Sequence, residues 1–493
     1  MKRRVSLAMA LMLSAGLALS ACGGSSTTAT TQAAKAAATT TAAAKAATTA
    51  AATTKAAAAT TKAAAAATTA AKGAASSGKY DNTYNVAGAG NVTLNVMITS
   101  LGDSDGGPFL RKVMDNYMKL YPNVKLVPVE CSMNDLYKTL ITQATAGTLP
   151  DIFTMSEAYS ANCEEMGMSV DNLDTLLGKD YMAQLLDVAV KNSTVKGKLI
   201  YMPWQNNTTA MVYRKDLFEK NGIQIPKTWD DFKAVAKKLT EDTNGDGTPD
   251  RYGAAFCGTR NDSAESRFQT FALTYGCDFL KVKSDGSFES GFNTDQFKKA
   301  MKAYIDMAAN DGITPPGFVE TGYSEAYTMI AADKACMFFS GSNVLGGIYN
   351  ANPDMKGKMG SFPMPTDTGV NPTTSFSSVG MTISKTCKNP EVAADFLKYM
   401  TSVDNSLDWN AATCRLPVVK DALNAIVAKD EAYKGFAEAS NSAVIYPAFA
   451  GTAELRDACG ECWQSAVSQG ISADDAIATA ISKADAVVKA KGK

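Results

Sequence analysis

The chain has 493 residues, of which 48 are Lys or Arg and 49 are Asp or Glu, and it contains no histidine. The missing histidine excludes Ser-His-Asp and Cys-His nucleophile systems, histidine-ligated zinc and imidazole acid–base chemistry. Charge is unevenly distributed, because residues 1–79 carry nine Lys and Arg and no acidic side chain, which leaves about −10 on residues 80–493. This acidic body argues against nucleic-acid binding. The length fits two to three domains.

The first residues have the layout of an export signal. Basic residues 2–4 precede an apolar run at 5–19 that is too short to span a bilayer comfortably. The run ends in Leu19-Ser-Ala-Cys22, which resembles the bacterial lipobox, in which the cysteine is acylated and becomes the new N-terminus. We therefore expect residues 1–22 to be a lipoprotein signal peptide, with lipidation at Cys22 and attachment to the membrane through acyl chains. An ordinary cleaved signal is the alternative.

A low-complexity segment follows the signal. Residues 23–79 are almost entirely Ala, Thr, Gly and Ser with spaced Lys, and they contain no aromatic or large aliphatic side chain. Such a composition cannot close a hydrophobic core, so we interpret it as a tether. The expected location is extracytoplasmic, at the outer face of the cell membrane, as in Gram-positive lipoproteins.

Nine cysteines remain after Cys22, an odd number that cannot pair completely within one exported chain. Cys459-Gly-Glu-Cys462 has the spacing of a redox or metal pair. No second pair and no histidine completes a tetrahedral site, so we interpret this pair as structural.

Hydrophobic periodicity predicts alternating strands and helices at the start of the body. Residues 92–98 alternate with the period of a strand, and apolar side chains at 110–121 share one helical face that ends before Pro122. A strand at 124–129, a helix around 136–141 and a strand at 151–153 follow. This order predicts a parallel sheet with right-handed crossovers.

Helix-start signals and short apolar runs continue downstream. Three helices are predicted to begin at Thr228 with Asp231, at Asn389-Pro390, and at Ser472 with Asp475. Further strands are predicted at 209–213, 336–339 and 381–383. The chain is therefore α/β, with enough segments for two sheets.

Five motifs occur in the order found in a known family. They are AGTLPDIF at 146–153, GKLIYMP at 197–203, VYRKDLFEKNG at 212–222, PKTWDDF at 226–232 and KNPEVAADFL at 388–397. With these motifs the chain resembles the extracellular solute-binding proteins of ABC importers, in the carbohydrate-binding group that includes maltose-binding proteins. The resemblance implies a periplasmic-binding-protein-like type II fold, in which two α/β lobes flank a ligand cleft and crossing strands form the hinge.

Alignment of these motifs implies the domain boundaries. Lobe 1 is expected to comprise 80–205 and 377–418, and lobe 2 to comprise 206–376 and 419–493. The chain is expected to cross between lobes near 204–207, 375–380 and 416–419.

Sugar binding needs hydrogen-bonding side chains for hydroxyl groups and apolar faces for ring C–H groups. Trp204 beside three amides suits this need, although the family's binding carboxylate falls on Asn207 and its cleft tryptophan falls near Ser342 and Asn343. The expected ligand-binding residues are Thr99, Ser100, Asp103, Ser156, Glu157, Trp204, Gln205, Asn206, Asn207, Arg260, Arg267, Ser342, Asn343 and Arg415. Trp229, Trp409 and Trp463 are interpreted as structural.

One loop matches a calcium motif in part. Asp242, Asn244, Asp246, Thr248 and Asp250 occupy the oxygen-ligand positions of an EF-hand loop, but Gly253 replaces the bidentate glutamate at its end. A tight turn between a helix and a strand is the alternative. No cofactor is expected to be required, and Ca²⁺ in this loop is the only candidate ion.

The leading functional hypothesis is a lipid-anchored binding protein that captures a sugar or oligosaccharide by hinge closure and delivers it to the permease subunits of an ABC importer. It is expected to be a monomer without enzymatic activity or nucleic-acid partners. One alternative is a cell-surface glycoside hydrolase, since two carboxylates need no histidine. The other is the same fold with a non-sugar ligand such as a peptide or polyamine.

Overall fold

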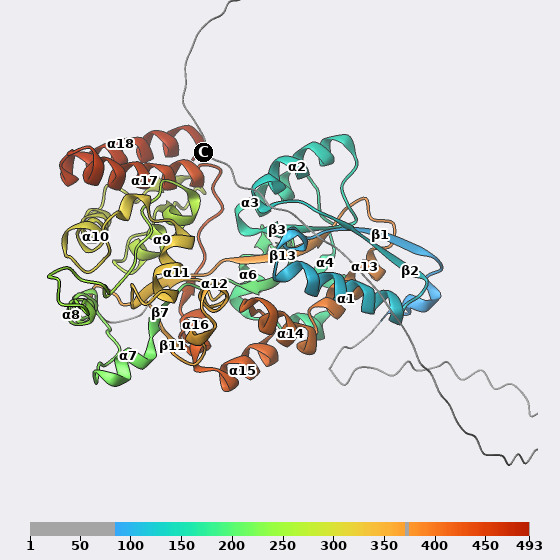
Figure 1. Ribbon diagram of the computed structural model, residues 1–493. Helices are drawn as coiled ribbons and strands as arrows, with labels where there is room; N and C mark the ends of the chain where they lie inside the picture. The colour runs from blue at the N-terminus through green and yellow to red at the C-terminus, as the bar shows by residue number, and fades with distance from the viewer. Residues whose placement is uncertain (1–83, 370–373, 493) are drawn as a thin grey trace, which may run out of the picture. The chain divides into compact units, whose positions relative to one another are not determined.

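The computed structural model describes residues 84–369 and 374–492, which form two α/β lobes (Figure 1). Each lobe has its own sheet and its own hydrophobic core. The expected signal peptide, the whole expected tether at 23–79 and Cys22 lie outside the described residues. The prediction of an α/β fold with two sheets is confirmed.

Lobe 1 is built on a six-stranded mixed sheet. Its strands, in spatial order, are β14 (Leu416–Pro417), β6 (Met202–Asn206), β13 (Ser378–Ile383), β3 (Ile152–Ser156), β1 (Val92–Met97) and β2 (Val124–Val129). β1 pairs in parallel with β2 and β3, as the sequence predicts, whereas β13 runs antiparallel to β3 and β6. The carboxyl ends of the three parallel strands therefore meet at one edge of this sheet.

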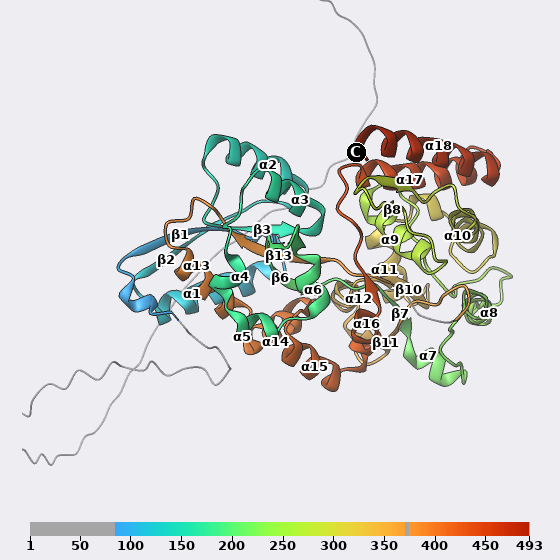
Figure 2. The ribbon, with the colours of Figure 1, turned by 180° about the vertical axis from the view of Figure 1, so that it is seen from behind.

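Alternating side chains of these strands face two helical layers. Val96 and Ile152 pack toward the core that includes α1 (Gly106–Leu120), α13 (Pro390–Met400) and Trp409 of α14 (Val403–Thr413). Their neighbours Met97 and Phe153 pack toward α2 (Met133–Ala146) and α3 (Glu157–Glu165). Figure 2 shows α2 and α3 on one side of this sheet and α1 and α14 on the other. The two-residue period of the strands thus buries both faces.

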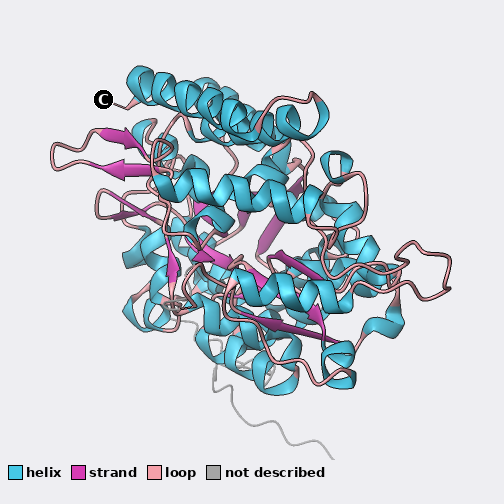
Figure 3. Ribbon diagram, turned by 90° about the vertical axis from the view of Figure 1, so that its left-hand side faces the viewer, coloured by secondary structure: helices cyan, strands magenta, loops and turns pink. Residues whose placement is uncertain are grey.

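Lobe 2 contains a smaller antiparallel sheet in the order β10 (Met337–Ser340), β7 (Ala210–Arg214) and β11 (Met359–Phe362). Helices enclose the strands (Figure 3), and the core is rich in aromatic rings, among them Phe268, Tyr304 and Trp463. Its helices are α7 (Lys215–Lys220), α8 (Trp229–Leu239), α9 (Asp262–Leu273), α10 (Asp295–Ile305), α11 (Tyr323–Ala331), α12 (Asn343–Ala351), α15 (Lys420–Lys429), α16 (Lys434–Ser440), α17 (Thr452–Ser468) and α18 (Ala473–Lys491).

Shorter elements complete the described chain. Three helices in the lobe 1 segment are α4 (Leu173–Leu177), α5 (Lys179–Ala183) and α6 (Asp187–Asn192). The two-stranded pairs are β4 (Thr194–Val195) with β5 (Lys198–Leu199), β8 (Leu280–Val282) with β9 (Phe288–Ser290), and β12 (Thr374–Ser375) with β15 (Ala443–Val444).

The three predicted helix starts are observed, and two of them, at Thr228 and Ser472, carry capping hydrogen bonds. Thr228 and Asp231 form a reciprocal capping box at α8. Ser472 accepts a hydrogen bond from the backbone N–H of Asp475 at α18, and Pro390 occupies the first turn of α13.

The chain passes between the two sheets after β6 and again before β13. β6 ends at Asn206 in the lobe 1 sheet, and β7 begins at Ala210 in the lobe 2 sheet. β13 returns to lobe 1 with a register shift between Val379 and Gly380. A Cβ at Gly380 would lie 2.0 Å from the carbonyl oxygen of Met202, so only glycine allows β13 and β6 to approach this closely.

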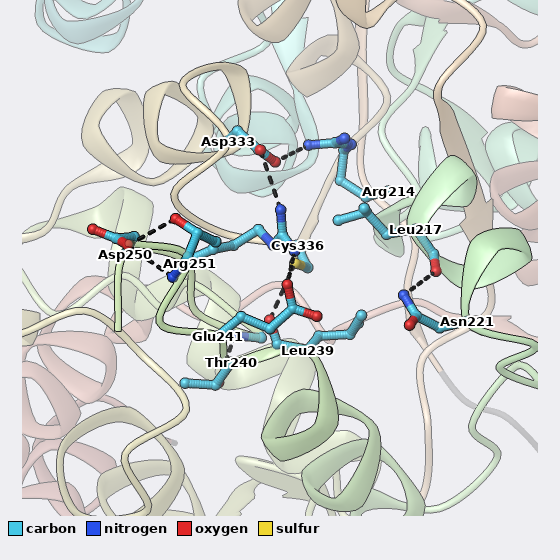
Figure 4. A network of polar contacts seen from close by, with 12 residues as sticks. Arg214, Leu217, Asn221, Leu239, Thr240, Glu241, Asp250, Arg251, Asp333 and Cys336 are labelled. Atoms are coloured by element: carbon cyan, nitrogen blue, oxygen red, sulfur yellow. Dashed lines mark hydrogen bonds and ion pairs between the residues drawn. The ribbon is translucent and has the colours of Figure 1, made fainter. Parts of the chain in front are cut away.

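A network of two buried arginines joins several segments of lobe 2 (Figure 4). Asp333, after α11, forms ion pairs with both Arg214 of β7 and Arg251. Asp216 and Glu241 supply a further carboxylate to Arg214 and Arg251 respectively. Because each buried guanidinium has more than one carboxylate partner, its charge is compensated within the lobe.

All nine cysteines from Cys131 to Cys462 are free thiols, and Cys459 and Cys462 are buried in α17, as a structural interpretation requires. Within the described part of the chain, we found no helix with the length and apolar character needed to span a bilayer.

Candidate ligand-binding cleft

A cavity of about 650 Å³ lies at the carboxyl ends of β1 and β2. The segment after β1 contributes Thr99, Ser100 and Asp103, and the segment after β2 contributes residues 130–133. The remaining polar lining comes from the crossing strands and from lobe 2: Gln205, Asn207, Asn343 and Arg415. This is the edge of a parallel sheet where open α/β folds bind ligands.

The side chains of this cavity are held in place by one another. Arg415 forms an ion pair with Asp103 at 3.0 Å, and its guanidinium lies 5.3 Å from the ring centroid of Trp409. Asn343 donates a hydrogen bond of 2.7 Å to the hydroxyl of Tyr323. These contacts orient planar polar groups before any ligand arrives, which lowers the entropy cost of binding.

A second cavity of about 250 Å³ adjoins the first, since Asn207 and Asn343 line both. Lobe 1 contributes Glu157, the first residue of α3, and lobe 2 contributes Arg267 and Arg456. Tyr446 and a set of small hydroxyl side chains complete the wall: Thr209, Ser266, Thr270, Ser340, Ser375 and Ser377. Burial raises the pKa of Glu157 above its ordinary value.

Most of the residues expected to bind ligand line these two cavities. The first cavity contains Thr99, Ser100, Asp103, Gln205, Asn207, Asn343 and Arg415, and the second adds Glu157 and Arg267. They come from segments far apart in the sequence, and the structure brings them together.

Trp204 does not lie in either cavity, contrary to the expectation. The residue is only 2% exposed and its ring packs against Trp409, with centroids 4.4 Å apart. Because strand residues alternate between faces, Gln205 lines the cavity while Trp204 faces the core. Trp204 therefore affects the cleft indirectly, because it packs against Trp409, whose ring contacts the guanidinium of Arg415.

Four other expected residues are also outside the cavities. Asn206 bonds to Ser440 within the protein, and the hydroxyl of Ser342 accepts from the backbone N–H of Leu416. Ser156 is buried as the last residue of β3. Arg260 forms surface ion pairs with Asp457 and Glu461 on α17. The sequence alone reveals neither these bonding partners nor the burial of Ser156.

Tyr446 and Arg456 are the main residues that the sequence analysis missed. Tyr446 lies between α16 and α17 in a segment without periodicity, and Arg456 lies on α17, far in sequence from Glu157. The Tyr446-Pro447 pair after an apolar run was the only available signal, and it indicates a turn rather than a site.

The candidate calcium loop is closed by its own hydrogen bonds. Asp242 accepts from the backbone N–H groups of Gly245 and Gly247, and Asp250 accepts from Thr243 and Asn244. In the same way, Asp246 accepts from the backbone N–H of Thr248, and Asn244 accepts from the backbone N–H of Asp246. Among residues 84–369 and 374–492, no cluster of three or more acidic or cysteine side chains is arranged to hold a metal ion. This geometry is that of a turn, and calcium binding stays a prediction.

The comparisons with known proteins agree with this architecture. The family model for bacterial extracellular solute-binding proteins matches residues 102–406, more than half of the chain. The chain belongs to this family. A putative binding protein of Brucella abortus is 25% identical over 410 residues, covering 82% of this chain and 94% of that protein. The multiple sugar-binding protein of Streptococcus mutans is 24% identical over 301 residues, covering 59% and 68%.

A solved structure supports the fold of this solute-binding protein. The ABC transporter solute-binding protein of Thermotoga lettingae, bound with α-D-tagatose, superposes with a TM-score of 0.68 at 22% identity. The match covers 81% of this chain and all of that chain. The family and its structural relatives are binding proteins rather than enzymes, so the glycoside hydrolase alternative is not supported.

Proposed function

We propose that this solute-binding protein captures a carbohydrate in its cleft and presents it to the permease of an ABC importer. The observation that carries the proposal is the first cavity, whose wall combines side chains of lobe 1, a crossing strand and the first turn of α12 in lobe 2. A solute that touches both lobes binds the closed arrangement more tightly and so favours closure.

The chemistry of the wall supports a sugar. Gln205, Asn207, Asn343, Asp103 and Arg415 offer planar amide, carboxylate and guanidinium groups, each able to hydrogen bond to vicinal hydroxyls. The named ligands of two relatives are of the same class, a set of sugars for the Streptococcus mutans protein and tagatose for the Thermotoga lettingae protein. A peptide or a polyamine remains the competing ligand class.

The test is a thermal-shift screen of the purified protein against mono- and oligosaccharides, with peptides and polyamines as competitors. A sugar at about 100 times its Kd is expected to add about 2.7 kcal/mol to the free energy of unfolding by mass action. Chromatography of the same sample should recover the sugar uncleaved. Stabilisation by polyamines or peptides alone, or cleavage of the sugar, would contradict the proposal.

We also propose that Cys22 anchors the protein to the outer face of the cell membrane. The wild-type protein is then expected in the membrane fraction and to incorporate a radiolabelled fatty acid in cells. Cys22→Ala is expected to lose the label and leave the membrane, while Cys131→Ala, a matched control, keeps both. Equal labelling of wild type and Cys22→Ala would contradict the anchor.

A further inference from the structure

Three buried polar atoms on residues that line the second cavity have no hydrogen-bond partner within residues 84–369 and 374–492. They are Oε2 of Glu157, Nε of Arg267 and the hydroxyl of Tyr446, and all three residues line this cavity. A buried polar atom without a partner destabilises a protein by about 1–3 kcal/mol. Three such atoms around one hollow indicate that a bound solute supplies the missing partners.

The charge balance of this cavity is the second observation. Seven arginines occur in residues 84–369 and 374–492, and six of them have a carboxylate within ion-pair distance. The exception is Arg267, whose guanidinium donates to Ser263 and to Ser340 and, in the part of the chain that the structure describes, to no carboxylate. A ring stacks on it as well, since its Cζ lies 4.5 Å from the centroid of Tyr323. Arg267 is thus oriented and uncompensated.

Neighbouring groups do not cancel this positive charge. Asp262 is paired with Arg456 at 2.7 Å, and among the described residues Glu157 forms no ion pair with Arg267, since its Oε2 has no partner there. Three helices begin at the cavity wall, since Glu157, Asp262 and Asn343 are the first residues of α3, α9 and α12. Each helix N-terminus adds the equivalent of roughly half a positive charge. The second cavity therefore favours a negatively charged group.

We propose that the second cavity is a subsite for the carboxylate of a uronic acid residue, bound by Arg267 with Tyr446 as a hydroxyl donor. The inference rests on the proposed function and narrows its solute to an acidic oligosaccharide. A carboxylate fits a guanidinium because two N–H groups can donate to its two oxygens. The neutral part of the same oligosaccharide then occupies the first cavity, which shares Asn207 and Asn343.

The experiment is isothermal titration of the purified protein with short oligogalacturonates, oligoglucuronates and oligomannuronates. Each is compared with its methyl ester, which keeps the shape and removes the charge. At least one free acid is expected to bind about tenfold or more tightly than its ester, since a charge-assisted hydrogen bond is roughly twice as strong as a neutral one. This preference is expected to weaken as salt is raised.

Variants separate charge from structure. Arg267→Gln is expected to bind acid and ester about equally, whereas Arg267→Lys retains a preference for the acid. Arg260→Gln, outside both cavities, is the matched control and should behave as wild type. Melting curves of each variant confirm that it is folded, and a loss of binding in Arg267→Lys equal to that in Arg267→Gln would indicate a structural role and overturn the proposal.

The outcomes distinguish the inference from the function on which it rests. Binding of neutral sugars with no preference for acids overturns the carboxylate subsite and leaves the proposed function intact. Binding of sulfated or phosphorylated sugars without uronates also overturns it. Absence of binding to every carbohydrate overturns the proposed function itself.

Discussion

Adjacent residues of one strand have different roles in this protein because their side chains point to opposite faces. Gln205 lines the cleft, while the adjacent Trp204 packs on Trp409 beneath Arg415. Truncating the tryptophan would therefore disturb the cleft through the core rather than by loss of a direct contact with the solute.

Glu265 gives a pH dependence of stability. The residue is 4% exposed on α9, and burial together with the charges of Asp457 and Asp262 raises its pKa from 4.5 to about 7. The folded protein binds more protons than the unfolded chain between these two values. The contribution of Glu265 to the free energy of unfolding is thus complete below pH 4.5 and is lost as pH rises through 7.

Glu265→Gln removes this dependence. At pH 8 the variant is expected to be more stable than wild type by about 1–3 kcal/mol, while near pH 4 the two are expected to be similar. Urea unfolding across this pH range measures the difference. Glu454→Gln is the control of opposite sign, since Lys491 lowers the pKa of Glu454 and its loss should give no gain at pH 8. A constant difference between wild type and Glu265→Gln at all pH values would contradict the assignment.

At the scale of elements, the arginine network of Figure 4 ties β7 to the segments after α8 and α11. Asp333→Ala removes a shared carboxylate from Arg214 and Arg251, which are 5% and 8% exposed. Because Asp216 and Glu241 still compensate part of the charge, we expect a loss of about 2 kcal/mol, below the 3–5 kcal/mol typical of a fully broken buried pair.

Asp230→Ala is the matched control for this prediction. Its carboxylate pairs with Lys233 on the exposed surface of α8, with the aspartate side chain 92% exposed. Surface pairs of this kind contribute about 0–1 kcal/mol. Equal midpoints for the two variants in chemical denaturation would show that the network does not stabilise lobe 2.

For the whole molecule, the proposed function requires the two lobes to move about the crossing strands. The register shift at Val379 and Gly380 and the short link from Asn206 to Ala210 are the points where backbone angles can change. A solute moves the lobes from mostly open to mostly closed only if it prefers the closed form by about 10⁴-fold.

Solution scattering measures this closure. We expect the radius of gyration to decrease when a stabilising sugar is added at saturation, and to stay constant with a sugar that gives no thermal shift. Gln205→Ala is expected to need more of the same sugar for the same decrease, because it removes a planar polar group from the first cavity. An unchanged radius with a tightly bound sugar would contradict hinge closure.

Local sequence patterns are enough to predict several of the elements and their order along the chain. Local periodicity and capping residues predict β1, β2, β3, α8, α13 and α18, because those signals depend on neighbours within a few residues. Family motifs then implied two lobes, and nine of fourteen expected ligand-binding residues line the two cavities.

Which side chains face the cleft depends, in contrast, on contacts between segments that are far apart in the sequence. Trp204 and Asn206 are buried and contact other protein side chains, and Arg260 forms ion pairs with α17. Tyr446 and Arg456 line the second cavity although they lie far in sequence from the other residues there. The physical reason is that a strand's facing depends on its register with neighbours, and an arginine's role depends on whether a carboxylate lies near it in space. Local sequence reveals neither relation. Arg267, whose charge has no carboxylate partner among the described residues, differs from the other arginines only in its surroundings.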